Sequence, residues 1–241
     1  SLFNVPRLQQ YRALGYNVLL SGHAGVGKTA VITKVFEGLN WKYFSAPTMD
    51  PWVDLVGVPH PADDKKRGGK VLELVRPEFV KADDVEAIFI DELNRAPDKV
   101  LNALMELIQF KSINGLKFPN LRVVWAAINP EDDDETYDVE RLDPAQADRY
   151  HVTVNVPYEP NTEWFRKEYG DRVADSAIGW WNELTDEYKG LISPRRLQYA
   201  LDIYRENGDM RDVLPVESNV SKLRTALNTG PITEKLEKLM Q

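Results

Sequence analysis

Residues 22–29 read Gly-His-Ala-Gly-Val-Gly-Lys-Thr, a string that fits the pattern G-x-x-x-x-G-K-[ST]. An apolar run at 17–21 precedes the string, and a helical pattern at 27–38 overlaps its end. In a strand–loop–helix of this kind, glycines let backbone N–H groups turn toward an anion, and the helix N-terminus adds its free N–H groups. The string therefore predicts a phosphate-binding loop made of Gly22, His23, Ala24, Gly25, Val26, Gly27, Lys28, Thr29 and Ala30.

Two residues of the loop have side-chain roles in this prediction. Lys28 is expected to contact the β- and γ-phosphates of a nucleotide, and the Thr29 hydroxyl is expected to be a ligand of Mg²⁺. The alternative is a chance glycine-rich turn, but the flanking strand and helix argue against it.

Apolar segments alternate with helical patterns through the first two thirds of the chain. In the segment 98–110, for example, the apolar residues follow helical spacing. This alternation predicts an α/β fold with a parallel sheet covered by helices on both faces. The expected strands are 17–21, 42–46, 86–90, 122–127 and 150–156.

The pattern changes at 156–163, where two prolines interrupt it. Beyond this point the sequence is helical, with Gly or Pro between the segments. We therefore expect two domains, an αβα nucleotide-binding core at 1–157 and a small all-helical lid domain at 158–241. Four large apolar residues are expected in the core of the helical domain, namely Trp180, Trp181, Leu197 and Leu201.

The segment 87–97, Ala-Ile-Phe-Ile-Asp-Glu-Leu-Asn-Arg-Ala-Pro, predicts the other half of a hydrolytic site. Its apolar strand places Asp91 at the carboxyl end, where ligands gather in open α/β sheets. Asp91 is expected to hold Mg²⁺ through water, and Glu92 to polarise the attacking water. The alternative for this acidic pair is a solvated turn.

Asn129 lies in the segment 123–130, which is a third apolar strand ending in a polar residue. Its amide is placed to hold the attacking water or the γ-phosphate, although an Asn-Pro after a strand is more often a simple turn.

Three strings together resemble the MoxR-like AAA+ ATPases. Asp-Glu-Leu-Asn-Arg-Ala at 91–96 is close to that family's D-E-I-N-R-A, and 142–150 resembles its L-x-x-A-x-x-D-R-F. Ser-Pro-Arg-Arg at 193–196 resembles its S-P-R string. The chain departs from the family pattern at Leu93, which replaces Ile, and at Tyr150, which replaces Phe.

The resemblance implies further roles and a nucleotide. Asn129 corresponds to sensor 1, and Arg149 to an arginine finger that reaches a neighbouring subunit's ATP. Without the family context, Arg149 is interpreted as a surface charge paired with Asp148. Arg195 corresponds to sensor 2, with Arg196 as the alternative. The expected cofactors are ATP and Mg²⁺, and the expected assembly is a homo-oligomeric ring, usually a hexamer.

Two inserted segments also fit the family. The segment 53–80 resembles a hairpin inserted into the second helix of the fold, and 111–122 resembles the hairpin before sensor 1. In the latter, Asn114-Gly115 is a favoured two-residue turn. The alternative for both segments is a decorated surface loop.

The composition argues for or against particular classes of binding partner and cellular location. The net charge of -8 argues against a protein that mainly grips nucleic acid. No run of apolar residues is long enough to cross a membrane. The chain has no cysteine, which fits a reducing compartment, so a cytoplasmic location is expected. Its three histidines have no ligand spacing.

These observations favour an ATPase that remodels or assembles a partner protein. The family implies a client or adaptor protein, often one with a von Willebrand factor A domain. The main rival is a nucleic-acid translocase or loader on the same core. A P-loop kinase is a second rival, but it would need neither Arg149 nor a helical lid. A nucleotide-switched scaffold is a third, and Glu92 argues against it.

Overall fold

The computed structural model describes residues 3–75, 85–130, 142 and 144–240, and of residues 230–238 it describes the backbone alone. The chain divides into two compact units. One contains Ser1–Gly22 and Ile32–Asn155, and the other contains His23–Val31 and Val156–Gln241. The domain boundary expected after residue 157 remains a prediction.

A five-stranded sheet forms the centre of the first unit, with the strand order β2-β5-β8-β1-β9. Every neighbouring pair in it is parallel, so the expected α/β fold with a parallel sheet is confirmed. Its strands fall on the five predicted segments and are β1 (Val18–Ser21), β2 (Trp41–Ser45), β5 (Ala87–Asp91), β8 (Val123–Ile128) and β9 (Val152–Asn155).

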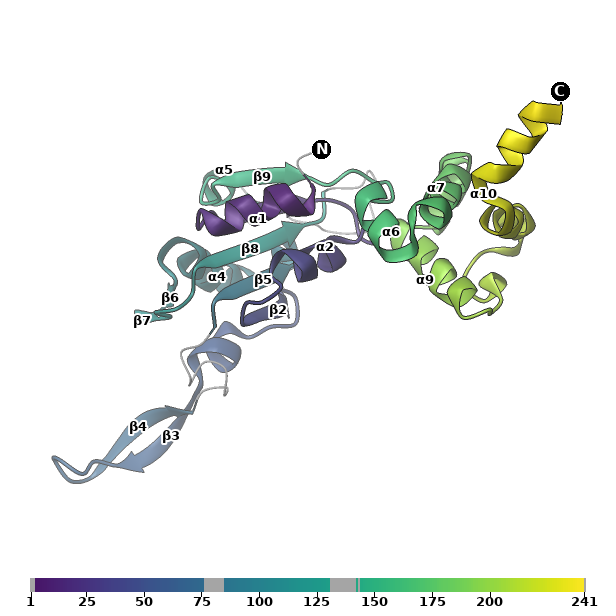
Figure 1. Ribbon diagram of the computed structural model, residues 1–241. Coiled ribbons are helices and arrows are strands. Elements are labelled where there is room, and N and C mark those ends of the chain that lie inside the picture. The colour runs from purple at the N-terminus through teal and green to yellow at the C-terminus, as the bar shows by residue number, and fades with distance from the viewer. Residues whose placement is uncertain (1–2, 76–84, 131–141, 143, 241) are drawn as a thin grey trace. The chain divides into compact units, whose positions relative to one another are not determined.

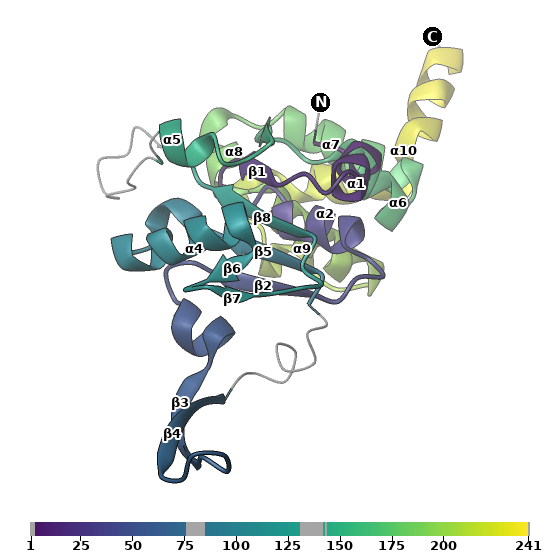
Figure 2. The ribbon, with the colours of Figure 1, turned by 90° about the vertical axis from the view of Figure 1, so that its left-hand side faces the viewer.

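Helices cover both faces of this sheet, α1 (Val5–Ala13) on one face and α4 (Asp98–Phe110) on the other (Figures 1 and 2). Ile88 and Ile90 of β5 pack in one core cluster with Leu104 and Leu107 of α4. Phe89 between them is also fully buried. Burial on both faces explains why β5 is a continuous apolar run up to Asp91.

Two hairpins form separate sheets. β3 (Val58–Asp63) pairs antiparallel with β4 (Lys70–Val75), after the helical turn η1 (Trp52–Val56). Within β3, Pro59 and Pro61 lie opposite Leu74 and Leu72. Residues 76–80 of the predicted insertion lie outside the described residues.

The shorter hairpin joins β6 (Ser112–Ile113) to β7 (Leu116–Lys117). Asn114 has φ 49° and Gly115 φ 80° at its turn. Positive φ at both central residues is the geometry that Asn-Gly favours, so the hairpin predicted from this dipeptide is confirmed. The short helix α5 (Pro144–Ala147) precedes β9.

The second unit is helical apart from the phosphate loop and the turns. The four predicted core residues are all buried there, Trp180 at 5% exposure and Trp181 at 2%, with Leu197 and Leu201 almost fully enclosed. The helical elements of the unit are α6 (Thr162–Tyr169), α7 (Asp171–Asn182), α8 (Asp186–Leu191), α9 (Pro194–Arg205), η3 (Met210–Asp212), η4 (Val216–Ser218) and α10 (Val220–Met240).

Candidate active site

The phosphate loop follows directly from β1 and leads into α2 (Lys28–Val35). Gly25 and Gly27 both have φ 81°, a left-handed conformation that favours glycine. Lys28 is 7% exposed at the first position of α2, and Val26 is buried. The neighbouring Gly22 N–H donates to the Ile128 carbonyl oxygen at 3.1 Å, which ties the start of the loop to β8.

The Ser-Pro-Arg-Arg string starts a helix in the second unit. Ser193 is the N-cap of α9, its Oγ accepts the Arg196 N–H at 3.2 Å, and Pro194 occupies the first helical position. These are strong helix-start residues on physical grounds alone. The Arg195 N–H donates to the Gly25 carbonyl oxygen at 2.8 Å, so the start of α9 is bonded to the phosphate loop.

The two candidate sensor arginines differ in their contacts. Both side chains are exposed. The Arg196 guanidinium lies 5.3 Å from the centre of the Tyr199 ring, a cation–π distance. Only Arg195 of the two bonds to the loop through its backbone. This arrangement favours Arg195 as the residue that responds to bound nucleotide, and the role remains a proposal.

Asp91 ends β5, and neighbouring groups hold its carboxylate. The Tyr43 hydroxyl donates to Asp91 Oδ2 at 2.9 Å, and the Glu92 N–H donates to Oδ1 at 2.9 Å. Tyr43 reaches Asp91 because β2 and β5 are in parallel register, with Ser45 opposite Asp91. Sequence reasoning assigned no role to Tyr43, which has the pattern of one more strand residue.

Glu92 has an uncommon backbone conformation for a residue with a side chain, with φ 53° and ψ 40°. It is the N-cap of the turn η2 (Leu93–Arg95). Its Oε1 lies 2.9 Å from an Arg95 Nη1, and its Oε2 lies 3.4 Å from the Ser45 hydroxyl. The carboxylate is therefore restrained at both oxygens, and the left-handed backbone is held in place by the turn that follows.

Asn129 follows the carboxyl end of β8, and Asn94 of η2 contacts its backbone. Asn94 Nδ2 donates to the Asn129 carbonyl oxygen at 2.8 Å, and the Asn129 N–H donates to Asn94 Oδ1 at 3.3 Å. Asn129 Oδ1 is buried and has no hydrogen-bond partner within the described part of the chain. A buried acceptor without a partner is rare in a folded protein, and it fits a site that completes itself with a ligand or water.

Arg149 lies at the amino end of the parallel strands, whereas the residues above lie at the carboxyl end. It comes just before β9, whose first residue Val152 is in register with Val18 at the start of β1. Asp91 and Asn129 are at the carboxyl ends of their strands. The structure thus brings Asp91, Glu92 and Asn129 together at the carboxyl ends of the strands. Arg149, whose side chain is exposed, does not lie with them.

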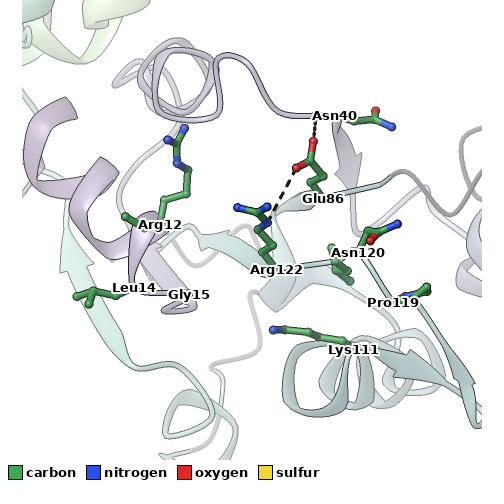
Figure 3. A pocket seen from close by; sticks show the side chains of 11 residues that line it. Arg12, Leu14, Gly15, Asn40, Glu86, Lys111, Pro119, Asn120 and Arg122 are labelled. Carbon is green, nitrogen blue, oxygen red and sulfur yellow. Dashed lines mark hydrogen bonds and ion pairs between the residues drawn. The ribbon is translucent and has the colours of Figure 1, made fainter.

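A cavity of about 690 Å³ also lies at this amino end of the strands (Figure 3). Cationic side chains line this cavity, and each of them interacts with the part of the protein next to it. Arg12 donates to the Val35 carbonyl oxygen at the end of α2, Lys111 is the C-cap of α4, and Arg122 lies 4.0 Å from Glu86. Cations at helix C-termini offset the negative end of the helix dipole. The cavity contains none of the candidate site residues.

The residues present fit Mg²⁺ of the kind that nucleotides carry. Within the described ranges, no group of three His, Cys, Asp or Glu side chains could hold a metal ion by itself. Mg²⁺ at phosphate sites usually takes one or two carboxylates, with phosphate oxygens and waters as its other ligands. A single carboxylate such as Asp91, at the carboxyl end of β5, meets that need. None of the helices in the described residues combines the length and apolar character needed to cross a membrane.

Comparison with known proteins agrees with these features. Residues 17–149 match the family described as AAA domain (dynein-related subfamily). The chain is 33% identical to the chaperone MoxR1 of Mycobacterium tuberculosis over 152 residues, which are 59% of this chain and 36% of that protein. It is 30% identical to the protein MoxR of Paracoccus denitrificans over 155 residues, 60% of this chain and 42% of that protein.

The chain therefore spans about two fifths of the length of the curated relatives that it matches. The resemblance to MoxR-like AAA+ ATPases that was inferred from motifs is confirmed. Among solved structures, NtrX from Brucella abortus in complex with ATP has a TM-score of 0.52 and 16% identity, over 91% of this chain and 56% of that one. This likeness supports the fold alone.

Proposed function

The chain belongs to the AAA domain family, in its dynein-related subfamily, and from this premise we propose that it binds ATP with Mg²⁺, hydrolyses it, and uses the hydrolysis to remodel or assemble a partner protein. The observation that carries the proposal is that three candidate site residues lie at the carboxyl ends of neighbouring strands. Asp91 ends β5, while Asn129 and Gly22 directly follow β8 and β1, and these three strands are neighbours in that order. Ligands of open α/β sheets bind at these ends of the strands.

The roles follow from charge and position. Lys28 neutralises the β- and γ-phosphates, and the backbone N–H groups of residues 22–29 surround them. The Thr29 hydroxyl and Asp91 hold the metal, whose charge stabilises the phosphates when it is bound. Glu92 accepts a proton from the attacking water, and Asn129 orients that water or the γ-phosphate. Arg195 reports the γ-phosphate from the start of α9.

Replacing Glu92 with Gln separates binding from hydrolysis. Gln keeps the size of the side chain but cannot accept a proton, and a positioned general base contributes about 10²–10⁴-fold in rate. We expect Glu92→Gln to bind a fluorescent ATP analogue like the wild type while phosphate release falls by at least about 10²-fold.

Lys28→Ala is the companion variant. It removes a charge-assisted contact worth about 1.5–3 kcal/mol, so nucleotide affinity falls by roughly tenfold or more. Wild-type phosphate release by Glu92→Gln, or wild-type affinity in Lys28→Ala, contradicts the assigned site.

We infer the kind of partner from the printed name of one relative. One of them carries the name chaperone, which supports a role in remodelling protein, and we propose a cytoplasmic homo-oligomeric ring, hexameric in form. The client or adaptor protein, with a von Willebrand factor A domain in our proposal, is sought by cross-linking on Glu92→Gln rings held in ATP. The Lys28→Ala protein serves as the control, because it binds the nucleotide more weakly.

A further inference from the structure

Asn94 is one of the few buried polar side chains of the first unit, with 7% of its surface exposed. It lies in η2, two residues after Glu92. Both of its hydrogen bonds go to one residue, because Nδ2 donates to the Asn129 carbonyl oxygen at 2.8 Å and Oδ1 accepts the Asn129 N–H at 3.3 Å. A side-chain amide has a donor and an acceptor in one plane, so it can pair with a peptide group as another strand would.

This pairing holds the backbone of Asn129, and the side-chain oxygen of Asn129 has no partner among the described residues. Asn129 Oδ1 is buried and accepts no hydrogen bond from the residues that the structure describes. The direction of the Asn129 side chain therefore depends on the backbone beneath it, and Asn94 is the group that holds this backbone.

The same turn also holds Glu92. The Arg95 N–H donates to the Glu92 carbonyl oxygen at 2.9 Å, which closes η2 around Asn94. Glu92 and Asn94 therefore lie in the same hydrogen-bonded turn. The Asn94 amide thus joins the segment that carries Glu92 to the segment that carries Asn129.

We propose that Asn94 is a positioning residue for ATP hydrolysis, which fixes Asn129 relative to Glu92 so that both side chains face the same water and γ-phosphate. This inference rests on the roles proposed above for Glu92 and Asn129. It gives Asn94 a function that acts through Asn129 and involves no contact with nucleotide.

The ordinary alternative is that Asn94 only satisfies buried backbone groups. Asn17 provides a matched control, because it has the same chemistry at 4% exposure. Its Nδ2 donates to the Ile108 carbonyl oxygen at 2.9 Å, and its Oδ1 accepts the Val124 N–H at 2.9 Å. Asn17 precedes β1, so it lies at the amino end of the strands, away from Asp91 and Asn129.

The experiment compares Asn94→Ala, Asn17→Ala, Asn129→Ala and the double variant Asn94→Ala/Asn129→Ala. For each, kcat and KM for ATP are measured, along with the affinity for a fluorescent ATP analogue and the urea midpoint of unfolding. We expect Asn94→Ala to lower kcat by about 10-fold to 10²-fold, the size of effect that small misplacements produce. KM and nucleotide affinity should stay within about twofold, since only the transition state loses an interaction.

Asn17→Ala should lower the urea midpoint by a similar amount and keep the wild-type kcat. The double variant should have the kcat of Asn129→Ala, because residues that act through one another are not additive. Asn94→Asp is the second variant. It keeps the volume and the acceptor but sets an oxygen against the Asn129 carbonyl, so kcat should fall in it as well.

Three outcomes overturn the inference. Wild-type kcat in both Asn94 variants, while Asn129→Ala is slow, removes the role of Asn94 and leaves the proposed function intact. Multiplicative losses in the double variant show that Asn94 acts by another route. A kcat for Asn17→Ala as low as that for Asn94→Ala means that destabilisation alone explains the effect. Wild-type kcat in both Asn129→Ala and Glu92→Gln contradicts the proposed function itself.

Discussion

The hydroxyl oxygen of Tyr150 is a polar atom in the hydrophobic core of the first unit. The side chain is 6% exposed and belongs to the cluster that includes Leu104 and Val124. Its hydroxyl has no hydrogen-bond partner in the described residues, and burial raises the pKa of the phenol well above its usual value. The family string has Phe at this position, so the hydroxyl is an addition to a site shaped for an apolar ring.

Tyr150→Phe should therefore stabilise the fold. A buried polar group without a partner costs roughly 1–3 kcal/mol, and its removal returns part of that cost. We expect the free energy of unfolding in urea to rise by about 1 kcal/mol, with phosphate release unchanged. A loss of stability in Tyr150→Phe means that the hydroxyl has a partner outside the described residues.

The phosphate loop is the element whose backbone depends most on glycine. A Cβ atom at Gly25 would lie 2.7 Å from Ser193 Cβ, closer than real Cβ contacts allow, and φ there is 81°. The carbonyl of Gly25 also accepts the Arg195 N–H. Any side chain at Gly25 therefore disturbs the loop and its bond to the start of α9 together.

Gly25→Ala should impair nucleotide binding beyond its effect on stability. Gly38→Ala is the control, because Gly38 has φ 85°, open space around it and a place outside the loop. Both variants should lose about 1 kcal/mol of stability from the left-handed backbone. Only Gly25→Ala should bind a fluorescent ATP analogue more weakly, by about tenfold or more. Equal binding by the two variants contradicts a tight loop at Gly25.

Elements whose signals are local could be predicted from the sequence. The apolar runs marked the strands of the sheet, and Asn114-Gly115 marked a hairpin. Asp91 and Asn129 could be placed at one edge because parallel strands share the direction of their carboxyl ends.

The partners of the site residues could not be predicted in this way. Tyr43 meets Asp91 only through the register of β2 on β5, and Asn94 meets Asn129 only because η2 turns back toward β8. Both contacts join residues distant in sequence, and no short spacing encodes them. The one available signal for Asn94 was a polar residue between the apolar Leu93 and the start of α4.

At the scale of the whole molecule, the position of Arg149 bears on assembly. Arg149 precedes the amino end of β9, whereas Asp91 and Asn129 lie at the carboxyl ends of β5 and β8. The side chain is exposed. We propose that this arginine, at the amino end of its own strand, serves the site of a second copy of the chain in the proposed ring.

Mixing two inactive variants tests this arrangement. An arginine finger supplied by a partner is worth about 10³–10⁵ in turnover in GTPases, so Arg149→Ala should bind ATP and hardly hydrolyse it. Lys28→Ala should hydrolyse little ATP, because it binds the nucleotide weakly and lacks the charge that contacts the β- and γ-phosphates. When the two are mixed with subunit exchange, some interfaces combine an intact Lys28 with a neighbour's intact Arg149, and phosphate release should partly recover. No recovery at any ratio, with exchange confirmed, argues against the ring.

The prolines of the β3–β4 hairpin limit how copies of the chain can join. Pro59 and Pro61 have no N–H. The Asp64 N–H donates to the Gly69 carbonyl oxygen, and hydrogen-bonded pairs alternate along an antiparallel ladder, so Pro59 and Pro61 fall at positions whose N–H would point outward from the hairpin. The outer edge of β3 therefore cannot continue a hydrogen-bonded ladder. Growth of a fibril by strand stacking needs two usable edges on every copy. Only the outer edge of β4 can therefore pair with a further strand. Copies of the chain that are close together in an assembly cannot extend this hairpin into a continuous β-sheet.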